Sequence, residues 1–220
     1  GYKISLTKRG DIAVRLGITG KYNVSIDERR TRQDAIEKKV NEIIAAAPVD
    51  ADEYTRTKYA YEYIITHTDY DPEAKDNQNI VSVFLNGHSV CQGYSMAMKY
   101  LLDRMGIMCT IVYGSANDEN HSWNMVRMDG VECFVDATWG DASYKEAPAL
   151  EDAEKINYNY FGVNDYILLR THRISTPAPI PECTSLDRYY YVVEGEYFED
   201  VDMEQLSDCF EKARANGERH

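Results

Sequence analysis

The sequence has no long apolar run. Nowhere in its 220 residues do apolar side chains continue for the roughly 20 positions that a membrane-spanning helix needs. We therefore expect no integral membrane segment in this chain.

Basic residues are scarce as well. Lys and Arg together number 24 against 37 Asp and Glu, which gives a net charge of −13. Proteins bind a phosphate backbone with clustered Lys and Arg, so this balance argues against a nucleic-acid partner. The simplest role of such acidity is solubility.

Paired metal-ligand spacings are missing. The cysteines lie 18, 24, 50 and 26 positions apart, with no CxxC pair, and their odd number leaves at least one thiol unpaired within the chain. This spacing is typical neither of a zinc site nor of a disulfide framework. The histidines outside the motifs below have no partners at metal spacing either, so we expect no metal and no cofactor. The five cysteines are Cys91, Cys109, Cys133, Cys183 and Cys209, and these histidines are His67, His88, His172 and His220.

The composition, 44% hydrophobic and 28% charged, is that of a globular protein long enough to bury a core. We expect a strand and helix extension over 1–50, a core over 51–175, and a C-terminal hairpin and helix over 176–220 in the same domain. No Met precedes Gly1. If a leader has been removed, an extracellular or cell-surface location is favoured.

Helical periodicity marks two segments before the core motifs. Ser25 and Glu28 form a capping-box pattern, and the apolar face that follows ends at Pro48. A second helix is expected from about Asp52, then a polar loop over 68–79.

Cys91 heads the next helix. An apolar stripe follows it and Gly106 is a natural stop, which places Cys91 in the first helical turn. The stripe consists of Tyr94, Met98, Leu101, Leu102 and Met105.

Strand signals follow this helix. We expect a buried strand over 107–113, a polar turn over 117–120, and strands over 121–128 and 131–138. Asp129-Gly130 between the last two is a strong two-residue hairpin signal. Near the C-terminus, residues 189–193 and 197–198 suggest a further hairpin.

The Asp129-Gly130 register has a chemical consequence. It pairs Trp123 with Asp136 and His121 with Thr138, which places all four side chains on one face of the sheet. His121 and Asp136 then become diagonal neighbours, close enough for a hydrogen bond. A thiol at a helix start beside such an imidazole is favoured as thiolate, the nucleophilic form.

Three local sequences carry a family resemblance: GHSVCQGYS around Cys91, HSWNMV from His121 and FVDATW around Asp136. With the order Cys, His 30 residues on and Asp 15 further, they resemble the transglutaminase-like core of bacterial proteins. The segment from Tyr160 to His172 looks like the tail of the same module. The resemblance covers about residues 54–172.

The resemblance implies an α+β, papain-like fold in which the helix bearing the nucleophile packs against an antiparallel sheet. It gives the nucleophile role to Cys91, the general-base role to His121 and the orienting role to Asp136. The Cys91 backbone N–H would be one oxyanion donor. Gln78 or Asn79 are candidates for the second.

The function that follows is acyl transfer through a Cys91 thioester, with a peptide or protein as substrate. We expect a cysteine peptidase or amidase, because polar residues flank the three motifs and would admit water. Candidate substrate contacts are Gln92, Trp123 and Trp139.

Three alternatives stay open at this point. One is transglutaminase-type crosslinking, with an amine as acceptor. Another is a non-catalytic module that binds peptide or cell-wall polymer. Arylamine acetyltransfer shares the Cys-His-Asp order, but no basic cluster lies beside Cys91 to receive the phosphates of acetyl-CoA.

Overall fold

The structure, a computed structural model, describes residues 2–20, 23–141, 156–198 and 203–216. The chain divides into two compact units, Gly1–Lys39 and Val40–His220. The boundary falls inside the first helix, which begins in one unit and ends in the other. No helix in the described ranges is long and apolar enough to cross a membrane.

The N-terminal unit holds a hairpin and the start of a helix. Strands β1 (Tyr2–Arg9) and β2 (Ile12–Gly20) pair antiparallel, with a bulge after Thr7. Helix α1 spans Ile26–Ala46. The Ser25 hydroxyl accepts the Glu28 backbone N–H at 3.1 Å, the first bond of the expected capping box.

Helices α2 (Glu53–Thr66) and α3 (Cys91–Arg104) form one layer of the C-terminal unit. The Asp52 carboxylate caps α2 by accepting the Thr55 N–H at 2.8 Å. The apolar stripe of α3 is buried and Gly106, with φ of 77°, follows its end, as the sequence predicts.

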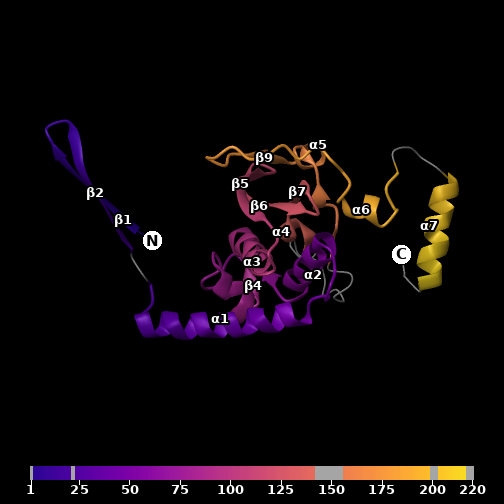
Figure 1. The fold of residues 1–220 in the computed structure, drawn as a ribbon, viewed down its shortest axis with the longest axis horizontal. Coiled ribbons are helices and arrows are strands. Elements are labelled where there is room, and N and C mark those ends of the chain that lie inside the picture. The colour runs from indigo at the N-terminus through magenta and orange to yellow at the C-terminus, as the bar shows by residue number, and fades with distance from the viewer. Residues whose placement is uncertain (1, 21–22, 142–155, 199–202, 217–220) are drawn as a thin grey trace. The chain divides into compact units, whose positions relative to one another are not determined.

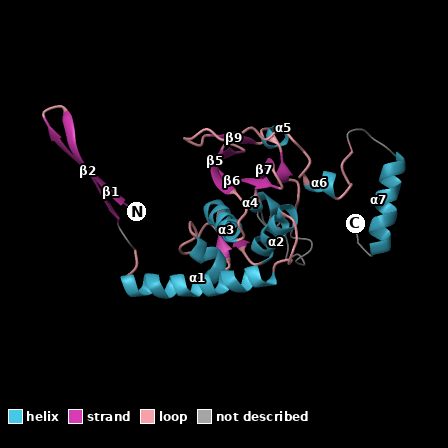
Figure 2. Ribbon diagram, in the orientation of Figure 1, coloured by secondary structure: helices cyan, strands magenta, loops and turns pink. Residues whose placement is uncertain are grey.

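The other layer is a five-stranded antiparallel sheet in the order β8-β7-β6-β5-β9, against which α3 packs (Figures 1 and 2). This is the α+β arrangement expected from the sequence. The strands of the sheet are β5 (Cys109–Ala116), β6 (Glu119–Met128), β7 (Val131–Val135), β8 (Phe161–Val163) and β9 (His172–Ile174). The remaining elements are β3 (Asp69–Tyr70), β4 (His88–Ser89), the π-helix η1 (Ser82–Asn86), α4 (Ala137–Gly140), α5 (Asp165–Leu168), α6 (Tyr190–Val193) and α7 (Met203–Asn216).

Alternation along β6 divides its side chains between two surroundings. Ser122 and Asn124 face α3, where both form hydrogen bonds to Ser95. Trp123 lies on the opposite face, in a buried cluster with Val112, Phe134, Val163, Leu168, Cys183 and Tyr189.

The β6–β7 hairpin has the predicted register. Met128 pairs with Val131, and the pairing continues to Asn124 and Val135. Asp129 and Gly130 have φ of 50° and 87°, the left-handed pair that a type I′ turn requires.

The return strand is shorter than predicted. It ends at Val135, so the expected pairing of Trp123 with Asp136 and of His121 with Thr138 is wrong. The reason is local: the Asp136 side chain accepts backbone N–H groups of the next residues and starts α4, which contains Thr138.

The expected late hairpin is also wrong, because Tyr190–Val193 forms the helical turn α6 and residues 197–198 do not form a strand. Tyr190 stacks on Tyr158 with ring centroids 3.8 Å apart, and Lys58 lies over the same ring. Packing on α2 and on the segment before β8 therefore overrides the β propensity of the YYVV sequence.

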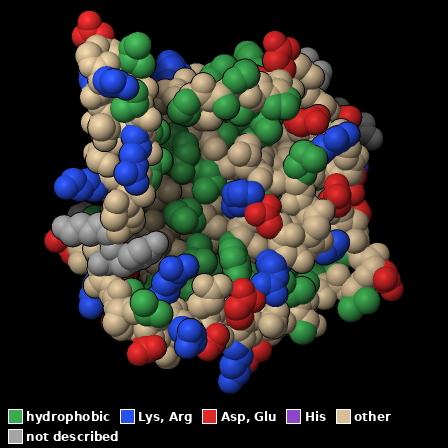
Figure 3. Space-filling model, turned by 60° about the vertical axis from the view of Figure 1, so that its left-hand side comes forward, with side chains coloured by type: hydrophobic (Ala, Val, Ile, Leu, Met, Phe, Trp, Pro, Cys, Tyr) green, Lys and Arg blue, Asp and Glu red, His purple; other side chains and the backbone are tan. Residues whose placement is uncertain are grey.

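On the face that Figure 3 draws, Lys and Arg side chains lie among acidic and apolar ones.

Candidate active site

Cys91 is the first residue of α3. Val90 before it is extended, with φ of −124° and ψ of 178°, so the helix begins abruptly at Cys91. As the first helical residue, Cys91 has a backbone N–H with no acceptor inside the helix. The positive end of the helix dipole also lies at this sulfur, where it favours a negative charge.

Gly93 allows the chain to turn tightly into this helix. A β-carbon at this position would overlap the Ser89 hydroxyl and press on the Asn77 carbonyl and the Ser82 hydroxyl. Ser89 and Ser82 share a hydrogen bond of 2.7 Å, and Ser89 also donates to the Asn77 carbonyl at 2.9 Å. A buried polar cluster thus fixes the segment that carries Cys91.

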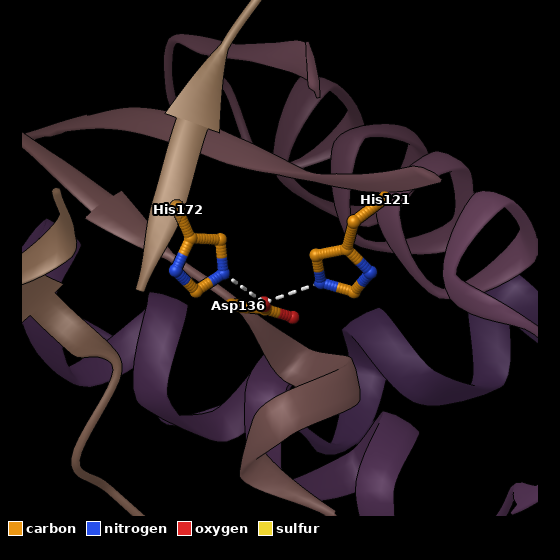
Figure 4. A group of neighbouring side chains, drawn as sticks. All are labelled: His121, Asp136 and His172. Carbon is orange, nitrogen blue, oxygen red and sulfur yellow. Dashed lines mark hydrogen bonds and ion pairs between the residues drawn. The ribbon is translucent and has the colours of Figure 1, made fainter. Parts of the chain in front are cut away.

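His121 lies near the start of β6. Its Nε2 is 2.7 Å from Asp136 Oδ2, and both side chains are buried. The ring packs against Trp123 and Trp139, with centroid distances of 5.8 and 6.1 Å. Nε2 faces the carboxylate, so Nδ1 is the nitrogen left for Cys91 (Figure 4).

Asp136 is held from several directions. Its Oδ1 accepts the backbone N–H groups of Thr138 and Trp139 at 3.0 and 3.1 Å, and its own N–H donates to the Tyr160 carbonyl. Burial alone would raise the pKa of this carboxyl group, but the charge and hydrogen bond of His121 outweigh it. The pKa of Asp136 therefore lies well below its usual range.

The same pairing acts on His121 in the opposite direction. Burial tends to lower the pKa of the imidazole, while the charge and hydrogen bond of Asp136, together with the neighbouring Cys91, raise it to about 10. The ring is therefore favoured as imidazolium at neutral pH.

Cys91 is half-buried, and His121 and Ser122 are the neighbours that act on the pKa of its thiol. Burial tends to raise the pKa of this thiol, but the neighbouring imidazole of His121, with smaller effects of Ser122, lowers it overall. Burial raises the pKa of Cys109 and Cys183 to about 12 and that of Cys133 as well. Cys91 is thus the thiol whose surroundings favour thiolate.

The other candidate contacts are distributed around this group. Trp139 is partly exposed beside His121, whereas Trp123 is 1% exposed and belongs to the core. Gln92 follows Cys91 in α3, and its Nε2 donates to the Tyr113 hydroxyl at 3.4 Å. Gln78 is exposed on a turn, and the Asn79 side chain accepts the Val81 N–H.

The structure adds one residue that the sequence reasoning missed. His172 in β9 is completely buried, and its Nε2 is 3.1 Å from the same Oδ2 of Asp136 (Figure 4). The available signal was its position at the end of the segment that resembles the family's tail. Its spacing from Asp136 in the sequence gives no indication of contact.

His121, Asp136 and His172 offer one ligand atom each within 4.8 Å of one another. Two imidazoles and a carboxylate are ligand types that divalent metals accept. Here, however, both Nε2 atoms lie at hydrogen-bond distance from Oδ2, and Oδ1 already accepts two N–H groups. Hydrogen bonding accounts for the whole arrangement.

Comparisons with known proteins agree with the resemblance in the sequence. Residues 39–139, just under half of the chain, match the family model described as transglutaminase-like superfamily. No curated protein matches the sequence.

Several solved structures match parts of the chain, among them the following three. One is a crystal structure of a TGase, with TM-score 0.45 and 19% identity over 59% of this chain and 37% of that one. A candidate cysteine protease from Cytophaga hutchinsonii gives 0.42 and 14% over 53% and 43% of the two chains. A candidate protease from Parabacteroides distasonis ATCC 8503 gives 0.38 and 8% over 60% and 35%. The matched region is less than half the length of each of these proteins. Within this chain, residues 39–139 form a transglutaminase-like domain.

Proposed function

We propose that this chain is a thiol-dependent acyl-transfer enzyme that hydrolyses a peptide or amide bond through a thioester on Cys91. The observation that carries the proposal is one arrangement: a thiol at a helix start whose pKa is lowered by the neighbouring His121, and a His121 ring that lies 2.7 Å from Asp136. The transglutaminase-like domain supports the same chemistry.

The resting pair is a Cys91 thiolate beside a His121 imidazolium. The thiolate attacks the carbonyl carbon of the substrate, a C–S bond forms, and the carbonyl electron pair moves onto oxygen. The Cys91 backbone N–H is placed to donate to this oxyanion. As the C–N bond breaks, His121 gives its Nδ1 proton to the leaving amine.

Hydrolysis completes the cycle. Neutral His121 takes a proton from water through Nδ1, the oxygen attacks the thioester carbon, and the C–S bond breaks to release the acid. The thiolate and imidazolium are restored together. Asp136 keeps the ring in position and stabilises its positive charge throughout.

The acceptor of the acyl group decides between hydrolysis, where it is water, and crosslinking, where it is an amine. Asn117 and Asp118 form an exposed turn just before β6, three to four positions ahead of His121, and such polar surroundings admit water. Trp139, whose ring centroid lies 6.1 Å from that of His121, packs edge to face with Tyr160 at 5.0 Å. We favour water as the acceptor.

A partition measurement tests the proposal. A glutamine-containing peptide is incubated with the protein, with and without a large excess of a primary amine, and the products are identified by mass. We expect free acid to predominate in both cases. An amine adduct formed in preference would establish crosslinking instead.

Two variants complete the test. Cys91→Ala should abolish product, whereas Cys209→Ala, a change of another partly exposed thiol, should leave it unchanged. If neither product forms and Cys91→Ala binds the peptide as the unmodified chain does, the chain is a binding module and the proposal is wrong.

A further inference from the structure

We propose that His172 is a positioning residue of the Cys91 site, acting through a second imidazole hydrogen bond to Asp136. The inference rests on the proposed function for its catalytic meaning. Its geometric basis is independent of activity: one carboxylate oxygen, Asp136 Oδ2, lies between two imidazole Nε2 atoms, at 2.7 Å from His121 and 3.1 Å from His172 (Figure 4).

Asp136 has every acceptor position engaged. Oδ2 receives the two imidazoles, and Oδ1 receives two backbone N–H groups from α4. Because the side chain is 1% exposed, each of these buried donors restricts the rotation of the carboxylate. His172 is the donor that enters from β9, opposite to His121.

The far side of His172 is fixed as well. Its Nδ1 is 2.8 Å from the Thr171 hydroxyl, which is 2.8 Å from the Tyr160 hydroxyl. Because an ionised carboxylate only accepts, Nε2 of His172 must donate. In neutral His172 the Thr171 hydroxyl then donates to Nδ1, and the Tyr160 hydroxyl donates to Thr171. Each of these groups then has a hydrogen-bond partner.

The His172 ring is enclosed and cannot touch a substrate. Its side chain is 0% exposed, and ring centroids of Trp139, Trp123 and Tyr160 lie 4.7, 4.8 and 5.2 Å away. His172 therefore acts on the reaction through its neighbours: it is hydrogen-bonded to Asp136, and its ring lies 5.6 Å from that of His121 and 4.7 Å from that of Trp139. This distinguishes it from His121, which reaches Cys91.

A second donor on Oδ2 has two effects on His121. It holds the oxygen on the line to His121 Nε2, and it disperses the carboxylate charge over two partners. Without it, the carboxylate is freer to rotate and more basic. The titratable groups that face the His121–Asp136 pair are Cys91 from α3, His172 from β9 and Tyr61 from α2. Burial and the charge of Asp136 raise the pKa of Tyr61.

The variants are chosen by shape. His172→Phe keeps a ring of similar size but removes the donor. His172→Gln returns an N–H donor near the position of Nε2. Thr171→Val removes the hydroxyl that fixes His172 and leaves the size of its side chain unchanged. Circular dichroism verifies that each variant is folded.

The first readout is the titration of His121, followed by NMR in the ¹⁵N-labelled chain. We expect His172→Phe to raise the His121 midpoint by about 0.5 to 1 pH unit, the equivalent of one net hydrogen bond. His172→Gln should restore most of the difference, and Thr171→Val should move it less, in the same direction. An unchanged midpoint in folded His172→Phe overturns the proposal; if that variant does not fold, an unchanged midpoint in both His172→Gln and Thr171→Val does so.

The second readout is turnover. His172→Phe should lower kcat by about ten- to a hundredfold, as loss of an outer-shell hydrogen bond typically does, with KM within about twofold. A rise in KM alone would mean a substrate contact and would also overturn the proposal. Absence of turnover in the unmodified chain would refute the proposed function, while the His121 titration would still decide the role of His172.

Addition of zinc is the remaining test of the proposal. If added Zn²⁺ abolishes the His121 titration in the unmodified chain and not in His172→Phe, the three groups form a metal site and the positioning role is wrong. We expect no such difference.

Discussion

The environment of the Cys91 sulfur contains two opposing influences. Burial disfavours a thiolate, whereas His121, Ser122 and the start of α3 favour it, and the net effect lowers the pKa of the thiol. The first prediction is that Cys91 reacts selectively with iodoacetamide near pH 6.5. An ordinary thiol is only about 1% ionised there, so we expect Cys91 to react at least about tenfold faster than partly exposed Cys209.

Peptide mapping after short exposure measures this selectivity. The buried thiols Cys109, Cys133 and Cys183 should remain unlabelled in the folded chain. His121→Ala should slow labelling at Cys91 without changing Cys209. Equal rates at Cys91 and Cys209 would mean that the thiol is not activated.

The His121–Asp136 pair should also make stability depend on pH. The pKa of Asp136 lies below its usual 3.8, so its contribution is present above that value and is lost as pH falls below it. The pKa of His121 is raised from 6.5 to about 10, so its contribution is complete below 6.5 and is lost as pH rises toward 10. The shared interaction is therefore strongest between about pH 4 and 6.5.

The second prediction uses Asp136→Asn, which keeps a good helix cap for α4 but removes the charge. At pH 5 to 6 we expect the free energy of unfolding to fall by about 3–5 kcal/mol, as for a broken buried ion pair. The loss should shrink toward pH 3 and toward pH 10. Urea unfolding at several pH values measures it, and a loss that is constant across this range would contradict the linkage.

The key side chains differ in how far the sequence predicts them. Cys91, His121 and Asp136 each lie within a local motif, so their residue types and order could be recognised. His172 reaches Asp136 only because β9 pairs with β5, where His172 lies opposite Ala116. That contact joins positions 36 residues apart and has no local pattern.

The sheet depends on a close approach between strands at Gly114. This residue pairs with His121 on one side and with Ile174 on the other. A β-carbon here would overlap the Arg173 carbonyl and lie 2.9 Å from the Trp123 ring. Gly114 thus allows β9 to bring His172 toward the other site residues.

The third prediction is that Gly114→Ala destabilises the fold and slows the labelling of Cys91 by iodoacetamide. We expect a loss of about 1–3 kcal/mol, the usual cost of inserting an atom into packed surroundings. Ser115→Ala, at the next position of β5, removes an atom instead and should change stability by less than about 0.5 kcal/mol. Thermal unfolding measures the stability of both variants, and labelling measures the reactivity of their Cys91. If the two variants have equal stability and equal labelling rates, β9 can shift without loss of stability.

Elements with strong local signals were predictable. The helix that follows Ser25 and Glu28, the start of a second helix near Asp52 and the Asp129-Gly130 turn follow from short patterns, and the structure has all of them. The end of β7 was not predictable, because it depends on Asp136 accepting the N–H groups of Thr138 and Trp139. The α6 turn depends on Tyr158, which is remote in sequence.

The turn between β6 and β7 also joins the sheet to the helix layer. Asp129 accepts the backbone N–H groups of Glu53 and Tyr54 at 3.0 and 3.2 Å and pairs with Arg188 at 3.2 Å. In return, the Asp129 N–H donates to the Glu53 carboxylate. A residue predicted only as a turn former thus also satisfies the N-terminus of α2.

The two units of the chain differ in how much they bury. In β1 and β2 the apolar side chains of Ile4, Leu6 and Ile18 are each more than half exposed. By contrast, Val40 and Ile43 near the end of α1, which belong to the C-terminal unit, are 0% and 3% exposed. A two-stranded hairpin is at best marginally stable by itself.

The last prediction follows from this difference. A chain lacking residues 1–24, which keeps Ser25 as the cap of α1, should unfold within a few degrees of the full chain and label Cys91 at the same rate within about twofold, since surface changes rarely exceed about 0.5 kcal/mol. Ile43→Ala in the full chain should instead cost about 2–5 kcal/mol, because it leaves a cavity beside α2, where Tyr59 donates to the Ile43 carbonyl. Calorimetry and labelling separate the cases: a shortened chain that unfolds early or loses Cys91 reactivity would mean that the hairpin is part of the domain that carries the site.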